Sequence, residues 1–149
     1  MDKLSVRLIQ QADYRFEIFF SDELPPIMGD EPPPLGTSSG ISPPQLLAAA
    51  VANCLSDSLL FSLRKFKQSP EPIQTTASCE VGRNPENHLR VIGILVELKL
   101  GVSAARLEYL DRVFKQFRDF CTVSSSVSLG IPVRVTVIDA DGVKVFEGS

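Results

Sequence analysis

The chain has 149 residues, of which 44% are apolar and 22% are charged, which is enough for one domain with a hydrophobic core. Its formal net charge is -3 and it has no basic block, so we expect no nucleic-acid or membrane partner, because both would need clustered lysine and arginine. The first ten residues lack the apolar run of a signal peptide, and we expect a cytoplasmic protein.

Two β-strands and a long arm are predicted at the start of the chain. The runs Lys3–Gln10 and Tyr14–Phe20 alternate apolar and polar residues, with a short turn between them. The segment Ser21–Gly40 has no periodicity, and its prolines stiffen it towards an extended geometry. Because a loop of this length in a compact domain is usually functional, we interpret it as a rigid arm over a site.

A long helix is predicted to follow the arm. Ser42 suits the N-cap and Pro43 the first helical position, and the helix should run to about Lys67. Between Leu46 and Leu55 nearly every face of this helix is apolar, which is typical of a helix buried on all sides. Polar residues interrupt the apolar stretch and argue against a membrane span.

Hairpins and a second helix make up the rest of the chain. The strands are predicted at Ile73–Val81, Leu89–Leu100, Ile131–Ile138 and Val143–Phe146. Ser103 caps a second long helix from Ala104 to about Phe120. This order predicts a single α+β domain over residues 1–149, in which two long helices pack on β-hairpins.

Three cysteines are the first candidates for chemistry. Cys54 lies in the middle of the first helix, and Cys121 continues the apolar stripe of the second, so both thiols should point inward. They are either two unrelated packed residues or a pair that meets in the core, and periodicity does not choose between these alternatives. Cys79 has an inward strand position beside Val81, and we interpret it as a small core residue.

A reactive Cys54 would need a cation from another element, because it lies too far along its helix for the helix dipole to lower its pKa. The available guanidiniums are those of Arg15, Arg83, Arg90 and Arg118, and the sequence does not choose among them. His88 is the only histidine and lies in a polar turn, so it predicts no zinc site, and we expect no metal.

Two segments resemble signatures of the OsmC/Ohr family, the osmotically inducible and organic hydroperoxide resistance proteins. The first is Gly40–Cys54, Gly-Ile-Ser-Pro-Pro-Gln-Leu-Leu-Ala-Ala-Ala-Val-Ala-Asn-Cys. The second is Cys121–Ser126, which is followed by Gly130–Val133 and a strand. The order of elements is also similar along nearly the whole chain.

The resemblance implies an OsmC-like fold, an intertwined homodimer, and two sites at the subunit interface. It implies that Cys54 is the peroxidatic cysteine and that Cys121 resolves the product. It also implies that the substrates are organic hydroperoxides, alkyl or fatty, which enter a pocket with an apolar mouth. An external thiol or dithiol would then be the reductant, and no cofactor would be needed. A thiolate converted to a sulfenic acid, which a second thiol condenses to a disulfide, is coherent chemistry for such a pair.

The sequence departs from Ohr-type members at one position. These have a glutamate ten residues before the first cysteine that orients the activating arginine, and Pro44 stands there in this chain. We take Arg15 with Glu31 as the candidate activating pair, with Asp30 as the alternative carboxylate. The alternative function is a non-enzymatic dimer that binds a small apolar or acyl ligand in the interface cavity.

Overall fold

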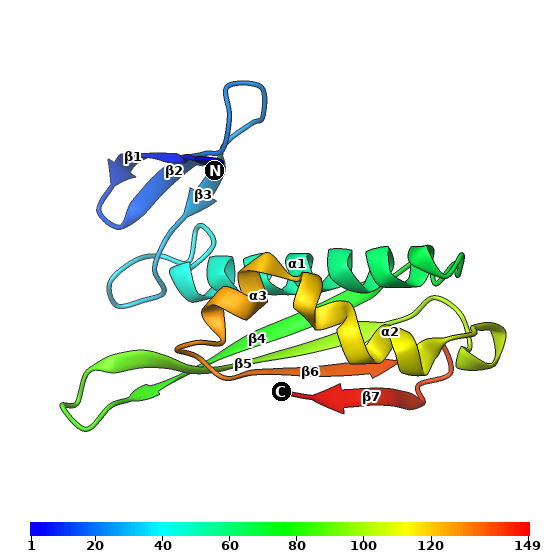
Figure 1. Cartoon of the computed structure of the whole chain (residues 1–149). Coiled ribbons are helices and arrows are strands. Elements are labelled where there is room, and N and C mark those ends of the chain that lie inside the picture. The colour runs from blue at the N-terminus through cyan, green and yellow to red at the C-terminus, as the bar shows by residue number, and fades with distance from the viewer. The chain divides into compact units, whose positions relative to one another are not determined.

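The computed structural model describes residues 1–149, which form two compact units (Figure 1). The first unit comprises Met1–Leu46 and the second Leu47–Ser149. The helix α1, Pro43–Lys65, begins at the end of the first unit and belongs mostly to the second.

The first unit contains an antiparallel sheet in the order β1-β2-β3. Its strands are β1 (Arg7–Ala12), β2 (Arg15–Phe19) and β3 (Ile27–Gly29). The predicted hairpin is therefore confirmed, but the arm was wrongly predicted to contain no strand. A strand of three residues is too short to show a period of two, and β3 forms because it pairs with β2 and is bridged to Ile41.

The remainder of the arm is folded around the buried carboxylate of Asp30. This carboxylate accepts hydrogen bonds from the backbone N–H groups of Glu31, Thr37 and Ser39, at 2.8, 3.2 and 3.0 Å. A fourth comes from the Thr37 hydroxyl at 2.9 Å. Together these bonds, led by that of Ser39, hold the pKa of Asp30 below its usual value. The arm is thus a closed loop with an internal anchor.

The long helix α1 begins and ends close to where the sequence predicts. The Ser42 hydroxyl accepts from the backbone N–H of Gln45, at 3.4 Å, and the Gln45 side chain accepts in return from the backbone N–H of Ser42, at 2.9 Å. This reciprocal cap fixes the helix start. The helix ends at Lys65 rather than Lys67, which has the left-handed φ of 57° that closes many helices.

Burial of α1 differs from the prediction. Val51, Leu55, Leu59 and Leu63 recur every four residues and are completely buried. Ala49 and Ala50 are exposed in the chain, so the prediction of burial on all sides is wrong for a single copy. The helix is long and apolar enough by composition to cross a membrane, a test that core helices of soluble proteins also pass.

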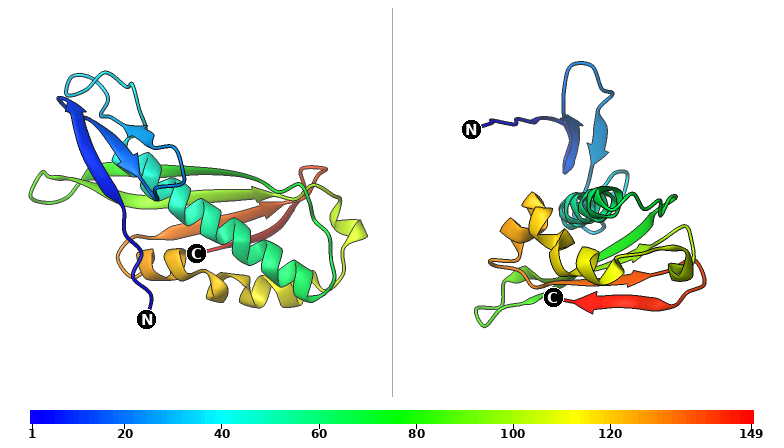
Figure 2. Two further views of the ribbon diagram at one scale, coloured as in Figure 1. Left: turned by 90° about the horizontal axis from the view of Figure 1, so that it is seen from above. Right: turned by 45° about the vertical axis from the view of Figure 1, so that its right-hand side comes forward.

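The second unit is built on a four-stranded sheet in the order β4-β5-β6-β7, in which only the β5–β6 pair is parallel. The strands are β4 (Gln74–Arg83), β5 (Leu89–Lys99), β6 (Val133–Ile138) and β7 (Lys144–Gly148). α1 and the shorter helices lie side by side on one face of this sheet (Figures 1 and 2). The core between them is apolar and includes Val51, Leu55, Leu59, Ile94, Val96, Leu98, Phe117, Cys121 and Val135.

The end of the β4–β5 hairpin breaks the predicted alternation. Val81 was expected on the inward face with Cys79, but it is about half exposed. The register shifts between Glu80 and Val81, where Ile92 is the extra residue of β5. A bulge of this kind twists the strand and re-aims the side chains beyond it, which accounts for the exposure of Val81.

The predicted second long helix is wrong in form. The segment consists of a 3-10 turn at Ala104–Arg106, helix α2 (Leu110–Gln116), a 3-10 turn at Phe117–Phe120, and helix α3 (Thr122–Val127). Ser103 does cap the first turn, but Tyr109 interrupts the helix with a left-handed φ of 63°. The apolar stripe survives these breaks, because Val113 and Phe117 remain completely buried.

Candidate functional site

Cys54 and Cys121 come from different elements of the second unit and meet in its core. Cys54 directly precedes the buried Leu55 of α1, and its side chain is half-buried. Cys121 is the N-cap of α3 and is completely buried. The two thiols are direct neighbours whose interaction shifts the pKa of Cys54. No disulfide joins them in this structure.

The pKa of the Cys54 thiol is raised above its usual value. Burial is the main cause, and the neighbouring Cys121 thiol adds to it. The backbone N–H groups of Val123 and Ser124, at the start of α3, act in the opposite direction by favouring the thiolate. Cys54 therefore receives help from a helix start, although from a different helix than its own, a contribution that the sequence did not indicate.

A depression of about 360 Å³ opens onto Cys54. Its other walls are Asp57, Ser58, Phe61 and Phe120. The two phenylalanine rings meet edge to face with centroids 5.3 Å apart, and the two residues are 55% and 41% exposed. A molecule in this depression can reach Cys54, whereas Cys121 has no exposed surface and does not line the depression.

No cation is among the groups that shift the pKa of Cys54. Arg83 donates to the backbone carbonyl of Asn87, and Arg90 donates to that of Leu89, both in the β4–β5 hairpin. Both arginines are exposed there. Neither is placed to act on the thiol by any contact within the second unit.

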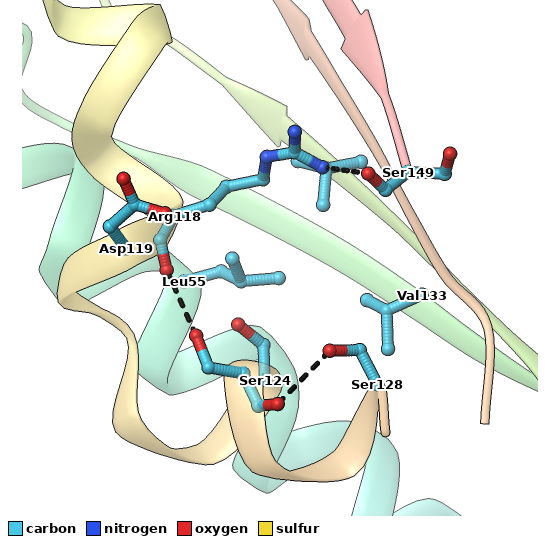
Figure 3. Close-up of a pocket in the computed structure, with 9 residues that line it drawn as sticks. Leu55, Arg118, Asp119, Ser124, Ser128, Val133 and Ser149 are labelled. Atoms are coloured by element: carbon cyan, nitrogen blue, oxygen red, sulfur yellow. Dashed lines mark hydrogen bonds between the residues drawn. The ribbon is translucent and has the colours of Figure 1, made fainter. Parts of the chain in front are cut away.

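Arg118 is likewise engaged elsewhere (Figure 3). It lines a hollow of about 230 Å³ against Leu55, and its Nη1 donates to the backbone oxygen of Ser149 at 2.6 Å. Its guanidinium also lies over the ring of Phe146, 5.5 Å from the centroid. In Figure 3 the Arg118 side chain extends along the hollow towards Ser149, where its guanidinium is engaged.

Arg15 and Glu31, the candidate activating pair, both belong to the first unit and form no ion pair with each other. Arg15 lines a small hollow of about 90 Å³ together with Asp30. Glu31 lines a different, apolar hollow with Phe16 and Ile41. The assignment of this pair to Cys54 stays a prediction.

Cys79 packs against the core from β4, as predicted. Burial raises the pKa of its thiol, and the backbone of Ala48 partly offsets the rise. His88 is exposed in the β4–β5 turn, where its backbone N–H donates to the Asn84 side chain at 2.9 Å. No group of three or more His, Cys, Asp or Glu side chains converges on a point that could hold a metal ion.

Sequence reasoning missed the aromatic walls of the site. Phe61 is seven residues after Cys54, two turns along the same helix face, so helical spacing could have placed it beside the thiol. Phe120 directly precedes Cys121, but the sequence places it only at the end of the second predicted helix. The 3-10 turn at Phe117–Phe120 leaves Phe117 in the core and directs Phe120 to the depression.

A family model described as OsmC-like protein matches residues 36–136 of this chain. None of the curated proteins matches the sequence. Several solved structures share the fold at low identity. An OsmC-like protein of unknown function from Vibrio cholerae is 18% identical, with a TM-score of 0.77 over 93% of this chain and 100% of that chain.

Two further structures have functional names. The organic hydroperoxide resistance protein OsmC of Legionella pneumophila is 18% identical, with a TM-score of 0.69 over 92% of this chain and 97% of that chain. The organic hydroperoxide resistance protein OhrB of Bacillus subtilis is 14% identical, with a TM-score of 0.69 over 91% and 98% of the two chains. At these identities the likeness establishes the fold.

The packing role of Cys79 predicts the behaviour of Cys79→Ala. This variant should lose about 1 kcal/mol of unfolding free energy, because one small, partly buried side chain is removed. Any peroxide-consuming activity should stay within twofold of the wild type, since the Cys79 thiol is not part of the Cys54 depression. Urea unfolding and peroxide consumption measure the two effects. Loss of activity in a folded Cys79→Ala protein would show that the thiols are misassigned.

Proposed function

The chain belongs to the OsmC-like protein family, and from the placement of its two thiols we propose that it is a thiol-dependent peroxidase that reduces organic hydroperoxides. The observation that supports this most directly is the asymmetry of the pair. Cys54 forms a wall of an open, aromatic depression, and Cys121 lies completely buried beside it. A substrate would therefore meet one thiol first and the other only through the first.

In the proposed reaction the Cys54 thiolate attacks the distal oxygen of the hydroperoxide. The O–O bond breaks, the alkoxide leaves and takes up a proton to become an alcohol, and Cys54 becomes a sulfenic acid. The backbone N–H groups of Val123 and Ser124 support the thiolate form. Phe61 and Phe120 would hold the organic part of the peroxide away from water.

The second step joins the two sulfurs. The Cys121 thiol attacks the Cys54 sulfur, the sulfenic oxygen leaves as water, and a disulfide forms. An external thiol or dithiol reduces this disulfide by exchange and returns both cysteines to the thiol form. No cofactor is required. We place the protein in the cytoplasm, because the cycle needs a supply of reduced thiol.

We also propose that the protein works as a homodimer. In each unit taken by itself, apolar surface remains open to solvent. In the second unit the exposed face of α1 includes Ala49, Ala50 and Phe61. In the first unit an apolar hollow of about 310 Å³ opens beside Phe16 and Ile18. Surfaces of this kind usually mark an interface, and a second copy of the chain is the partner that we propose.

The second candidate function is binding without catalysis. The raised pKa of Cys54 favours it, because a protonated thiol is a poor nucleophile at neutral pH. In that case the depression would hold a small apolar or acyl ligand. Chemical reactivity of Cys54 separates the two functions.

The roles of the two cysteines predict different serine variants. Cys54→Ser should abolish reduction of cumene hydroperoxide even in a single turnover, because a hydroxyl is a far weaker nucleophile than a thiolate. Cys121→Ser should react once and leave a sulfenic acid at Cys54, which a dimedone adduct detects by mass spectrometry. Wild-type protein should form a Cys54–Cys121 disulfide within one chain. Identical behaviour of the two variants, or three free thiols in peroxide-treated wild type, would favour the binding function.

The activating cation predicts a change in pH dependence. If Arg15 lowers the pKa of Cys54, Arg15→Ala should return that pKa to its raised value. The rate at pH 7 should then fall about tenfold for each unit by which the pKa of Cys54 rises. The deficit should shrink as the pH rises, because a larger fraction of the unassisted thiol is then ionised. Glu31→Gln should act in the same direction but more weakly. Stopped-flow reaction with peroxide from pH 5 to about pH 10 measures the profile, and Arg83→Ala is the matched control. Superimposable profiles for Arg15→Ala and wild type would assign the cation elsewhere.

The proposed assembly predicts a particle of twice the chain mass of 16.3 kDa. Light scattering after size exclusion should give this mass down to micromolar concentration, because the exposed apolar surfaces make the separated chain unfavourable. A stable monomer at that concentration would contradict the dimer.

A further inference from the structure

Two walls of the depression at Cys54, Phe61 and Phe120, lie beside a cation. The Lys65 ammonium lies 5.0 Å from the centroid of the Phe120 ring and 5.9 Å from that of Phe61. The ion pairs of the structure join Arg64 with Glu71 and Lys144 with Glu147, so no carboxylate neutralises Lys65. The aromatic walls thus lead from a thiol to a positive charge that has no anionic partner.

The spacing along α1 places these groups in one row. Phe61 lies seven residues after Cys54 in α1, and Lys65 lies eleven residues after it. Both spacings return a side chain to the same helix face as Cys54. At 1.5 Å per residue, the backbone distance from Cys54 to Lys65 is about 16 Å. The row therefore offers a reactive end, an apolar middle and a cationic end to an elongated molecule.

The opposite charge lies at the thiol end. Asp57 forms a wall of the depression beside Cys54, and its carboxylate accepts a hydrogen bond from the Asn53 amide at 3.0 Å. A negatively charged group would be repelled there and attracted by Lys65. An anionic molecule in the depression would thus have its charged group at Lys65 and its uncharged end at Cys54.

We propose that Lys65 is a specificity-determining residue that binds the carboxylate of an amphipathic organic hydroperoxide. The apolar stem of this substrate lies against Phe61 and Phe120, and its peroxide group reaches the Cys54 sulfur. The proposal rests on the proposed function, and what it adds is the residue that selects hydroperoxides with an anionic group remote from the peroxide.

The test compares a hydroperoxy fatty acid with its methyl ester, two substrates that differ only in the charged group. Wild type should favour the acid in kcat/KM by about three- to fivefold, the effect expected of a partly exposed ion pair. This preference should disappear at about 1 M salt, because the screening length is then only about 3 Å. In Lys65→Met, which keeps the apolar stem, the acid-to-ester ratio should fall to that of the salt-screened wild type, and in Lys65→Glu it should invert.

The matched control is Lys67→Asn. Lys67 is an exposed lysine two residues away, and asparagine tolerates its left-handed φ of 57°. This variant removes the same charge but should keep the wild-type ratio. An unchanged ratio in Lys65→Met, or an equal loss in Lys67→Asn, overturns the proposal and indicates a general effect of net charge.

A binding measurement separates this proposal from the peroxidase function. The corresponding hydroxy acid and its methyl ester are unreactive, and their affinities can be measured by calorimetry in the unmodified protein. Wild type should bind the acid more tightly by the same three- to fivefold, and Lys65→Met should not. If peroxide turnover is absent but this difference is present, the peroxidase function fails and the carboxylate site stands. Equal affinities for acid and ester in wild type overturn the carboxylate site, whatever the turnover.

Discussion

The packing of α1 on the β4–β7 sheet is the constraint on which the site depends. Val51, Leu55, Leu59 and Leu63 are completely buried, so this helix cannot rotate about its axis without exposing large apolar side chains. Each would cost about 1.5–3 kcal/mol to expose. Because Cys54 adjoins Leu55, the fixed rotation places its thiol at the edge of the buried stripe, between core and solvent. Half-burial of the Cys54 side chain is therefore a consequence of core packing.

The long, strongly patterned elements were predictable, and the short ones were not. α1 follows from its cap at Ser42 and its long apolar run, and β5 from a run rich in Val, Ile and Leu. The break at Tyr109 carries no glycine or proline signal, and β3 has only three residues. Both depend on contacts with distant residues, which local sequence does not contain.

The candidate site could be predicted in the same partial way. Periodicity placed Cys121 inward, and it is buried, although its backbone is extended between two short helical segments and not within one helix. That the two thiols meet followed only from the family resemblance. The amides of Val123 and Ser124 escaped prediction, because their role depends on the start of α3 lying against α1. Every residue except proline has the same backbone N–H, so residue type does not indicate which of these groups will face the thiol.

The position of Cys121 also determines which part of the chain would have to move in the proposed reaction. A disulfide needs a sulfur–sulfur bond of about 2.05 Å and a restricted dihedral angle, so one of the two cysteines must adjust when the bond forms. Cys54 is fixed by the four buried anchors of α1. Cys121 lies in an extended residue between a 3-10 turn of four residues and α3 of six residues. Short segments of this kind shift at lower cost than a helix of 23 residues that is anchored along its length. Closure and reopening of the bond should therefore be borne by the Phe117–Val127 segment, while α1 continues to present the Cys54 wall of the depression unchanged.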